Sequence, residues 1–206
     1  MEMKLEKKKQ FKISFIGDSS AGKTCIIRRY IKDEYVENQE PTFAVEFIKK
    51  EVKSNNESNE LLIWDCSGLK KFSSYLPSSL EGAKGIFFVY DISRSDSFKY
   101  LESKINEICD NDGKVKLNEK DNQQVIFILV GNKTDLEEKR EVKKEEGVKL
   151  ATEKRWPFFE TSAKSNKNIK EIFDCIVKEI NEALNKKTES KISHDVENNK
   201  YSCVIF

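Results

Sequence analysis

The residues with the clearest chemical potential form one loop, residues 17–24, with the sequence Gly-Asp-Ser-Ser-Ala-Gly-Lys-Thr. This sequence matches the phosphate-binding pattern GxxxxGK[ST], and it lies between an apolar run and a helical stretch, as the pattern requires. Backbone N–H groups of such a loop converge on phosphate oxygens, and the helix dipole favours the same charge. We expect Lys23 to hold the β- and γ-phosphates and the Thr24 hydroxyl to reach Mg²⁺. The loop alone does not identify the base or the reaction.

A second motif, at residues 131–135, could select the base. It reads Gly-Asn-Lys-Thr-Asp and follows the apolar run 125–130, so we expect it at the ligand-binding edge of an α/β sheet. The Asp135 carboxylate can accept from guanine N1–H and the 2-amino group. Adenine offers neither donor, and such sites discriminate by about 10⁴ or more. After the next expected strand comes Thr-Ser-Ala-Lys at 161–164, where the Ala163 N–H could contact guanine O6.

The elements that must position these motifs follow from the hydrophobic pattern. Apolar runs at 11–16, 86–90, 125–130 and 158–161 predict buried parallel strands. Two strand-like runs between 43 and 65 flank a turn at 55–59, which predicts an antiparallel hairpin. Residues 169–184 place apolar side chains on one helical face. We therefore predict a three-layer α/β fold, a mixed and mostly parallel sheet of about six strands flanked by helices.

Composition narrows the classes of function. Lys plus Arg number 37 and Asp plus Glu 36, so no charge excess indicates nucleic acid. The five cysteines show no metal-ligand spacing, which is typical of a reduced cytosolic protein. His194 is the only histidine and lies in a polar segment, so a His-ligated metal is not expected. We expect no membrane span, secretory signal or N-myristoylation.

Together these motifs resemble the Ras superfamily over about residues 11–185, most closely its Rab branch. Thr42 stands where the family has a metal-binding threonine, and residues 65–68, Asp-Cys-Ser-Gly, match its DxxG motif. The segments 42–47, 62–65 and 89–92 look Rab-like. The resemblance implies the G domain of a P-loop NTPase at 11–185. We expect a flexible extension at 1–10 and a flexible tail at 186–206.

The resemblance also implies the site. Mg²⁺ would be held by Thr24 and Thr42, and by Asp65 through water. Lys23, Thr42, Gly68 and position 69 would act in catalysis, with the Gly68 N–H on the γ-phosphate. The residues expected to bind GTP or GDP are Ser19, Ser20, Ala21, Gly22, Lys23, Thr24, Cys25, Tyr35, Thr42, Gly68, Asn132, Lys133, Asp135, Leu136, Ser162, Ala163 and Lys164.

Three features depart from the Rab pattern. Leu69 replaces the glutamine that orients the attacking water, which puts hydrolysis in doubt but not binding. Ser79 and Leu80 stand where Rab proteins usually have aromatic residues, so an effector surface that used them would have changed. The segment 110–122 is several residues longer than usual, and its composition favours an exposed loop rather than a binding element.

The C-terminal residues 203–206, Cys-Val-Ile-Phe, fit a CaaX box. The terminal Phe206 favours geranylgeranyl transfer to Cys203. Stable anchoring usually takes a second signal, and the tail is barely basic and has no second cysteine. We therefore expect reversible attachment to the cytoplasmic face of an endomembrane or the plasma membrane, with a soluble cytosolic pool.

These observations predict a monomeric, Rab-like GTP/GDP switch in vesicle traffic with impaired hydrolysis. Expected partners are effectors at the loops around Thr42 and Gly68, an exchange factor, a GTPase-activating protein, a prenyltransferase and a GDP-dissociation inhibitor. Three alternatives stay open: a GTP-holding module that hydrolyses little, a Ras-like signalling GTPase, or another P-loop enzyme such as a small kinase.

Overall fold

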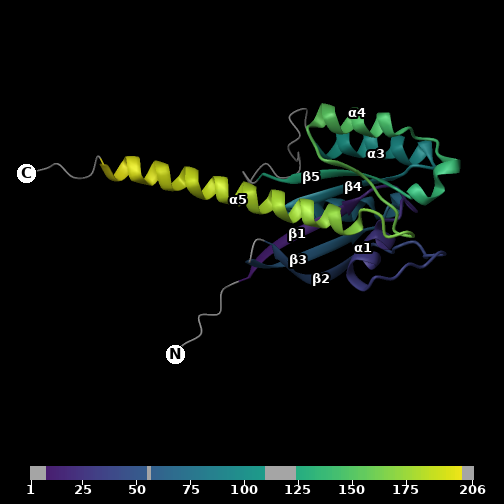
Figure 1. The fold of residues 1–206 in the computed structure, drawn as a ribbon, viewed down its shortest axis with the longest axis horizontal. Coiled ribbons are helices and arrows are strands. Elements are labelled where there is room, and N and C mark those ends of the chain that lie inside the picture. The colour runs from purple at the N-terminus through teal and green to yellow at the C-terminus, as the bar shows by residue number, and fades with distance from the viewer. Residues whose placement is uncertain (1–7, 55–56, 110–123, 201–206) are drawn as a thin grey trace, which may run out of the picture.

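The computed structural model describes residues 8–54, 57–109 and 124–200. In these ranges each strand is followed by a helical segment, except that two strands follow one another directly after the first α-helix (Figure 1). The strands are β1 (Lys9–Ile16), β2 (Val45–Ser54), β3 (Glu57–Cys66), β4 (Gly85–Asp91), β5 (Ile126–Asn132) and β6 (Phe158–Glu160). The α-helices are α1 (Lys23–Lys32), α2 (Leu76–Leu80), α3 (Ser95–Ile108), α4 (Lys144–Lys154) and α5 (Ile169–Lys200). Two 3₁₀ helices, η1 (Lys70–Tyr75) and η2 (Thr134–Lys139), lie between them.

The six strands form one mixed sheet in the order β2-β3-β1-β4-β5-β6. The β2–β3 pair is antiparallel, and every other neighbouring pair is parallel. This arrangement confirms the predicted α/β class. Because β1, β4, β5 and β6 are parallel, their carboxyl ends meet at one edge, where the loops that carry the chemical motifs also lie.

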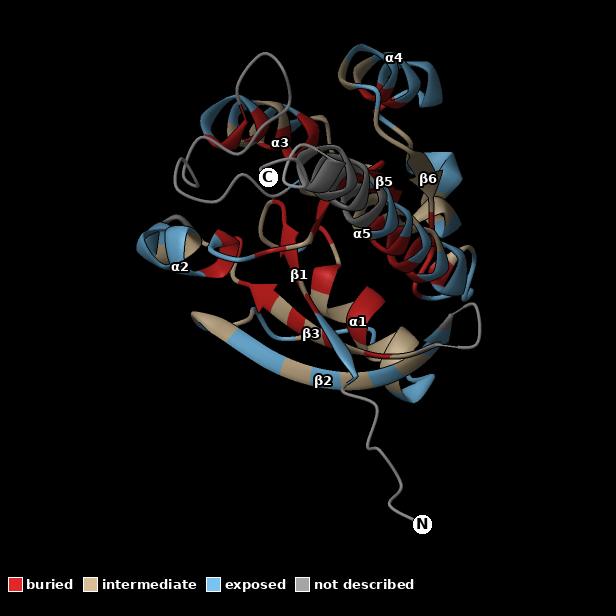
Figure 2. Cartoon of the chain, turned by 90° about the vertical axis from the view of Figure 1, so that its left-hand side faces the viewer, coloured by how far each residue is buried: buried red, intermediate tan, exposed pale blue. Residues whose placement is uncertain are grey.

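Two apolar layers hold the sheet between the helices. Alternate residues of a strand point to opposite faces, so Phe87 and Val89 of β4 join one cluster and Phe88 and Tyr90 join the other. The first cluster contains the buried faces of α1 and α5, and the second those of α2, α3 and α4. The buried residues accordingly lie on both sides of the sheet (Figure 2).

Helix α5 follows the predicted periodicity. Its buried apolar residues are Ile169, Ile172, Phe173, Ile176, Val177 and Ile180. The Phe173 ring stacks on Tyr30 of α1 with 3.6 Å between ring centroids, which ties the two helices on this face together. Each such buried side chain contributes about 1.5–3 kcal/mol to the free energy of unfolding.

Several boundaries differ from expectation. Strand β1 begins at Lys9, within the expected N-terminal extension. Strand β3 begins at Glu57, within the expected turn. Helix α5 continues to Lys200, past residue 186 where we expected the tail to start, because lysine, glutamate and serine tolerate a helix even without an apolar stripe. The long segment 110–122 and the CaaX residues lie outside the described residues.

Ser79 and Leu80, the positions that depart from the Rab aromatics, are fully buried. Leu80 packs in the apolar cluster under α3, and the Ser79 carbonyl accepts a hydrogen bond from the Ser14 hydroxyl. These two side chains therefore form part of the interior and not of an exposed surface. Among the described residues, no helix is both long and apolar enough to cross a bilayer.

Candidate nucleotide-binding site

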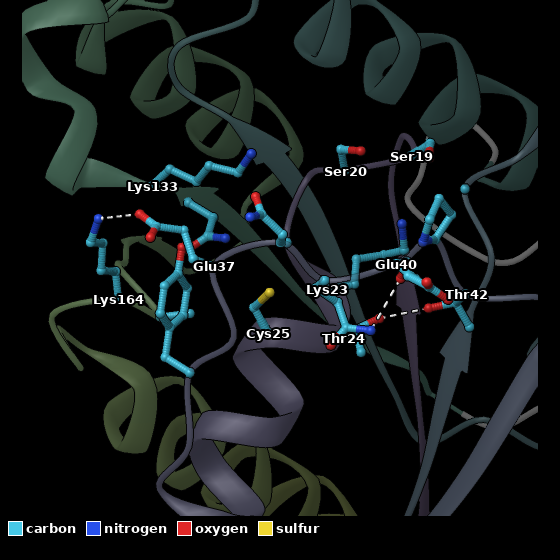
Figure 3. Close-up of a pocket in the computed structure, with 18 of the residues that line it drawn as sticks. Ser19, Ser20, Lys23, Thr24, Cys25, Glu37, Glu40, Thr42, Lys133 and Lys164 are labelled. Carbon is cyan, nitrogen blue, oxygen red and sulfur yellow. Dashed lines mark hydrogen bonds and ion pairs between the residues drawn. The ribbon is translucent and has the colours of Figure 1, made fainter.

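The loops at the carboxyl edge of the sheet enclose a cavity of about 400 Å³ (Figure 3). It is lined by Ser19, Ser20, Gly22, Lys23, Thr24, Cys25, Tyr35, Glu37, Asn38, Gln39, Glu40, Pro41, Thr42, Ser67, Gly68, Asn132, Lys133, Asp135, Leu136, Ala163 and Lys164. The structure thus brings together all the residues expected to bind nucleotide except Ala21 and Ser162. Sequence reasoning missed the stretch 37–41, although its place between Tyr35 and Thr42 was a usable signal, and it gave Ser67 no role in binding.

The phosphate end of the cavity is built around Lys23. Its side chain is buried, and its Nζ donates to the carbonyls of Gly17 and Asp18 at 2.9 and 2.8 Å. Burial lowers the pKa of this ammonium, while the Asp65 carboxylate opposes the shift. These carbonyls keep the ammonium within the loop, where it can meet the oxygens of a phosphate chain.

Next to Lys23, two hydroxyl groups and one carboxylate converge. The hydroxyls of Thr24 and Thr42 lie 2.7 Å apart, and both donate to Asp65 Oδ2, at 2.5 and 3.4 Å. The other carboxylate oxygen, Oδ1, is buried and has no hydrogen-bond partner among the described residues. Hard oxygen donors with one carboxylate suit Mg²⁺, which keeps several waters and binds phosphates. The residues present therefore fit this ion.

Asn132 joins the phosphate loop to the base end of the cavity. Its amide nitrogen donates to the Ala21 carbonyl at 3.0 Å, and its oxygen accepts from the Thr161 hydroxyl at 3.0 Å. This contact needs a glycine at position 22, because a Cβ there would lie 2.2 Å from the Asn132 nitrogen. Ala21 thus supports the site through its backbone, although it does not line the cavity.

At the end of the cavity where we expect the guanine base, two short contacts hold Asp135 and Lys133. Asp135 accepts a hydrogen bond from the Ser162 hydroxyl at 2.5 Å, so Ser162 acts behind the wall of the cavity. Lys133 has a left-handed φ of 69°, and its Nζ pairs with the buried Asp91 carboxylate at 2.7 Å. That pairing extends the lysine side chain along the cavity. Sequence reasoning did not single out Asp91, whose contact depends on strand order.

The outer rim is more exposed. Lys164 pairs with Glu37 at 2.9 Å, which links the loop after β6 to the loop after α1. Figure 3 shows this pair at the edge of the cavity, which the partly buried Tyr35 also lines, and burial raises the pKa of the Tyr35 hydroxyl. Because both members of the Lys164–Glu37 pair are largely exposed, we expect the pair to contribute little to stability.

Gly68 lies at the nucleotide cavity, whereas its neighbour Leu69 lies outside it. Gly68 is buried against the phosphate loop, and a Cβ there would lie 2.3 Å from the Ser19 nitrogen. Leu69, expected at the catalytic position, does not line the nucleotide cavity. It lines a smaller neighbouring cavity with apolar groups such as Ala44 and Phe72, which is where an apolar side chain avoids water.

Comparison with known proteins agrees with this geometry. Residues 12–182 match the model of the Ras family. The chain belongs to the Ras family. It is 33% identical to the Ras-related protein RABA6b of Arabidopsis thaliana over 95% of this chain and 82% of that protein. It is 36% identical to the Ras-related protein Rab-13 of Canis lupus familiaris over 82% of this chain and 79% of that protein.

The relatives carry Rab names, so the chain is a Rab-like small GTPase of the Ras superfamily. This membership confirms the resemblance and the fold predicted from the sequence. Ras-family proteins bind GTP and GDP, and the cavity described above stands where the motifs of that family meet.

Proposed function

We propose that this protein is a GTP/GDP switch that uses Mg²⁺ and acts in vesicle-mediated membrane traffic. The observation that carries the proposal is the convergence of three independent parts on one cavity. These parts are the phosphate loop, the Thr24–Thr42–Asp65 cluster and the Asp135 carboxylate. An ATPase or small kinase would need no carboxylate placed to accept two donors from guanine, so the base end favours GTP.

Guanine selectivity rests on Asp135. The Ser162 hydroxyl bonds one of its oxygens and fixes its orientation before the base enters. The Ala163 N–H is close to the same site, and the Arg29 guanidinium holds the Ala163 carbonyl at 2.9 Å. A base without the N1–H and 2-amino donors would leave the carboxylate unsatisfied, which is the physical source of discrimination.

In hydrolysis, water attacks the γ-phosphorus, the bond to the β–γ bridging oxygen breaks, and GDP leaves with that oxygen. The proton that the water loses passes to the phosphate product or to solvent. Thr24, Thr42 and Asp65 would hold Mg²⁺, which would offset the negative charge of the phosphate oxygens. Lys23 binds the same oxygens, and the Gly68 N–H stabilises the transferring group. Position 69 holds no polar group to orient the water, so we propose that intrinsic hydrolysis is slow.

A second candidate, a GTP-holding module that hydrolyses little, is favoured by Leu69 alone. Ser67 offers the cycling enzyme an alternative way to position water. Its hydroxyl lies at the nucleotide cavity and accepts from the Leu69 N–H at 3.3 Å. Single-turnover GTP hydrolysis separates the two: measurable conversion to GDP identifies the enzyme, and retained GTP identifies the module.

The switch itself involves the segment after α1 and the segment after β3. They are joined by one backbone hydrogen bond, from the Ser67 N–H to the Ala44 carbonyl at 2.9 Å. Phe43, Phe47 and Tyr75 are exposed on these segments and on β2 and η1. Losing the γ-phosphate would release Thr42 and Gly68 and rearrange this apolar surface, which is how such switches change effectors.

Membrane attachment completes the proposal. We propose that Cys203 is prenylated and that an exchange factor, a GTPase-activating protein and a GDP-dissociation inhibitor act on the protein. A GTP/GDP switch of this kind would cycle between the cytosol and the cytoplasmic face of a membrane.

The direct test is to extract the nucleotide from protein purified from its own cell. We expect GTP or GDP in about one equivalent, with chelation of Mg²⁺ accelerating its release. An adenine nucleotide in that position would contradict the proposal.

A further inference from the structure

Arg94, in the loop between β4 and α3, contacts the outside of the phosphate loop. Its Nη1 donates to the Ser19 carbonyl at 3.2 Å, and its Nη2 pairs with Asp18 Oδ2 at 2.9 Å. The guanidinium is partly exposed, and Arg94 does not line the nucleotide cavity. It therefore reaches the loop from behind, on the side away from the phosphates.

The direction of the Ser19 carbonyl fixes the direction of the next N–H. In a trans peptide the C=O of residue 19 and the N–H of residue 20 point to opposite sides. With the carbonyl held outward by Arg94, the Ser20 N–H points inward, toward the cavity that Ser20 lines. That N–H is one of the donors that the loop can offer to phosphate oxygens.

This orientation of the Ser20 N–H requires a strained backbone at Ser20. Its φ is 63°, in the left-handed region that residues other than glycine rarely adopt. Rotating the Ser19–Ser20 peptide would return φ to the negative range, but it would turn the N–H outward and aim a carbonyl oxygen at the phosphates. The strain therefore favours a state that cannot bind the anion.

The backbone around Arg94 is anchored, so the side chain can resist that rotation. The Arg94 N–H donates to the Asp91 carbonyl, and the Asp91 carboxylate accepts from Ser93 and pairs with Lys133. The next residue, Ser95, donates to Glu141 at 2.9 Å. The guanidinium thus extends from an anchored turn and meets two acceptors of the phosphate loop with its rigid fork.

We propose that Arg94 is a positioning residue that locks the Ser19–Ser20 peptide in its phosphate-binding orientation and thereby slows nucleotide release. The role rests on the proposed guanine nucleotide binding. The contribution of Arg94 should depend on the serine at position 20. A glycine there would adopt the positive φ without strain, so the peptide would need less support from Arg94.

The test is a double-mutant cycle on the release rate of a fluorescent GDP analogue in excess Mg²⁺. Arg94→Ala should raise this rate about tenfold, typical of losing a hydrogen bond from a charged donor. In the Ser20→Gly background the same change should raise it less than about threefold. Arg94→Gln keeps a donor for the Ser19 carbonyl and should release GDP more slowly than Arg94→Ala.

Lys170→Ala is the matched control, because it removes an exposed ion pair to Asp174 on α5, away from the cavity, and should leave release unchanged. If Arg94→Ala does not fold, Arg94→Lys replaces it in both backgrounds, since one ammonium cannot reproduce the fork. Equal effects in the serine and glycine backgrounds, or a wild-type release rate in Arg94→Ala, would overturn the inference. Wild-type protein that retains no GDP would instead overturn the proposed function.

Discussion

At the residue scale, the proposed slow hydrolysis rests on Leu69. Leu69 lines the smaller cavity beside the nucleotide site and not the nucleotide cavity itself. We propose that hydrolysis is slow because a polar group is missing: positioning the water is most of the catalysis in such sites, and losing one positioned group typically costs about 10²-fold or more.

Leu69→Gln should therefore raise single-turnover GTP hydrolysis at least about tenfold, which is ~1.4 kcal/mol of barrier. Nucleotide affinity should stay unchanged, because Lys23, Thr24 and Asp65 are untouched. Leu69→Met keeps an apolar side chain in the neighbouring cavity and should hydrolyse GTP at the wild-type rate. Equal rates for the glutamine and leucine proteins would assign the water to another group, with Ser67 the first to examine.

The residue scale also shows what the sequence could and could not predict. The motifs found Lys23, Thr24, Asn132 and Asp135 because their spacing is tied to the strand ends. Contacts between distant loops, such as Arg94 with Ser19, carry no local pattern and emerge only once the strand order places β4 beside β1.

At the element scale, the phosphate loop and the base-binding loop act as one unit through Gly22 and Asn132. Glycine at 22 provides a left-handed φ of 91° and leaves room for the Asn132 amide. The sequence predicted both loops and their shared sheet edge. Their bond was not predictable, since it depends on the close approach of α1 to the end of β5.

Gly22→Ala should weaken GDP binding by at least about tenfold, because a Cβ 2.2 Å from the Asn132 nitrogen must displace that amide. Gly82→Ala is the matched control: its φ is also positive, at 68°, but a Cβ there meets no atom within 4 Å. Both variants carry backbone strain of ~1–2 kcal/mol. Thermal unfolding of both proteins measures the backbone strain, and isothermal titration with GDP measures the effect of the clash on binding. Equal GDP affinities of the two variants would contradict this account.

At the scale of the whole molecule, α5 begins beside the nucleotide cavity and ends far from it. Its first residue follows the loop of Ala163 and Lys164 at the cavity, and the helix then runs back along the sheet to the opposite side (Figure 1). Over its 32 residues an α-helix spans about 48 Å. The nucleotide cavity and the C-terminal end of α5 therefore lie far apart on the molecule.

Cys203→Ser should move the protein from the membrane pellet to the soluble fraction when expressed in its own cell, because a hydroxyl cannot carry the thioether-linked prenyl group. Cys175→Ser, a substitution within α5, should leave the pellet fraction unchanged. Quantitative blotting of both fractions measures the shift. An unchanged pellet fraction for Cys203→Ser would show that another feature attaches the protein.

The central claim is that Asp135 selects guanine in a site built for GTP and GDP, and competition for a bound fluorescent GDP analogue tests it most directly. GTP should displace the analogue from the wild-type protein at least about 10⁴ times more effectively than ATP or xanthosine triphosphate. In Asp135→Asn, xanthosine triphosphate should become the better competitor, because the amide can donate to the xanthine 2-oxo group. Undiminished preference for GTP in that variant, or ATP competing equally with GTP in the wild-type protein, would contradict the account.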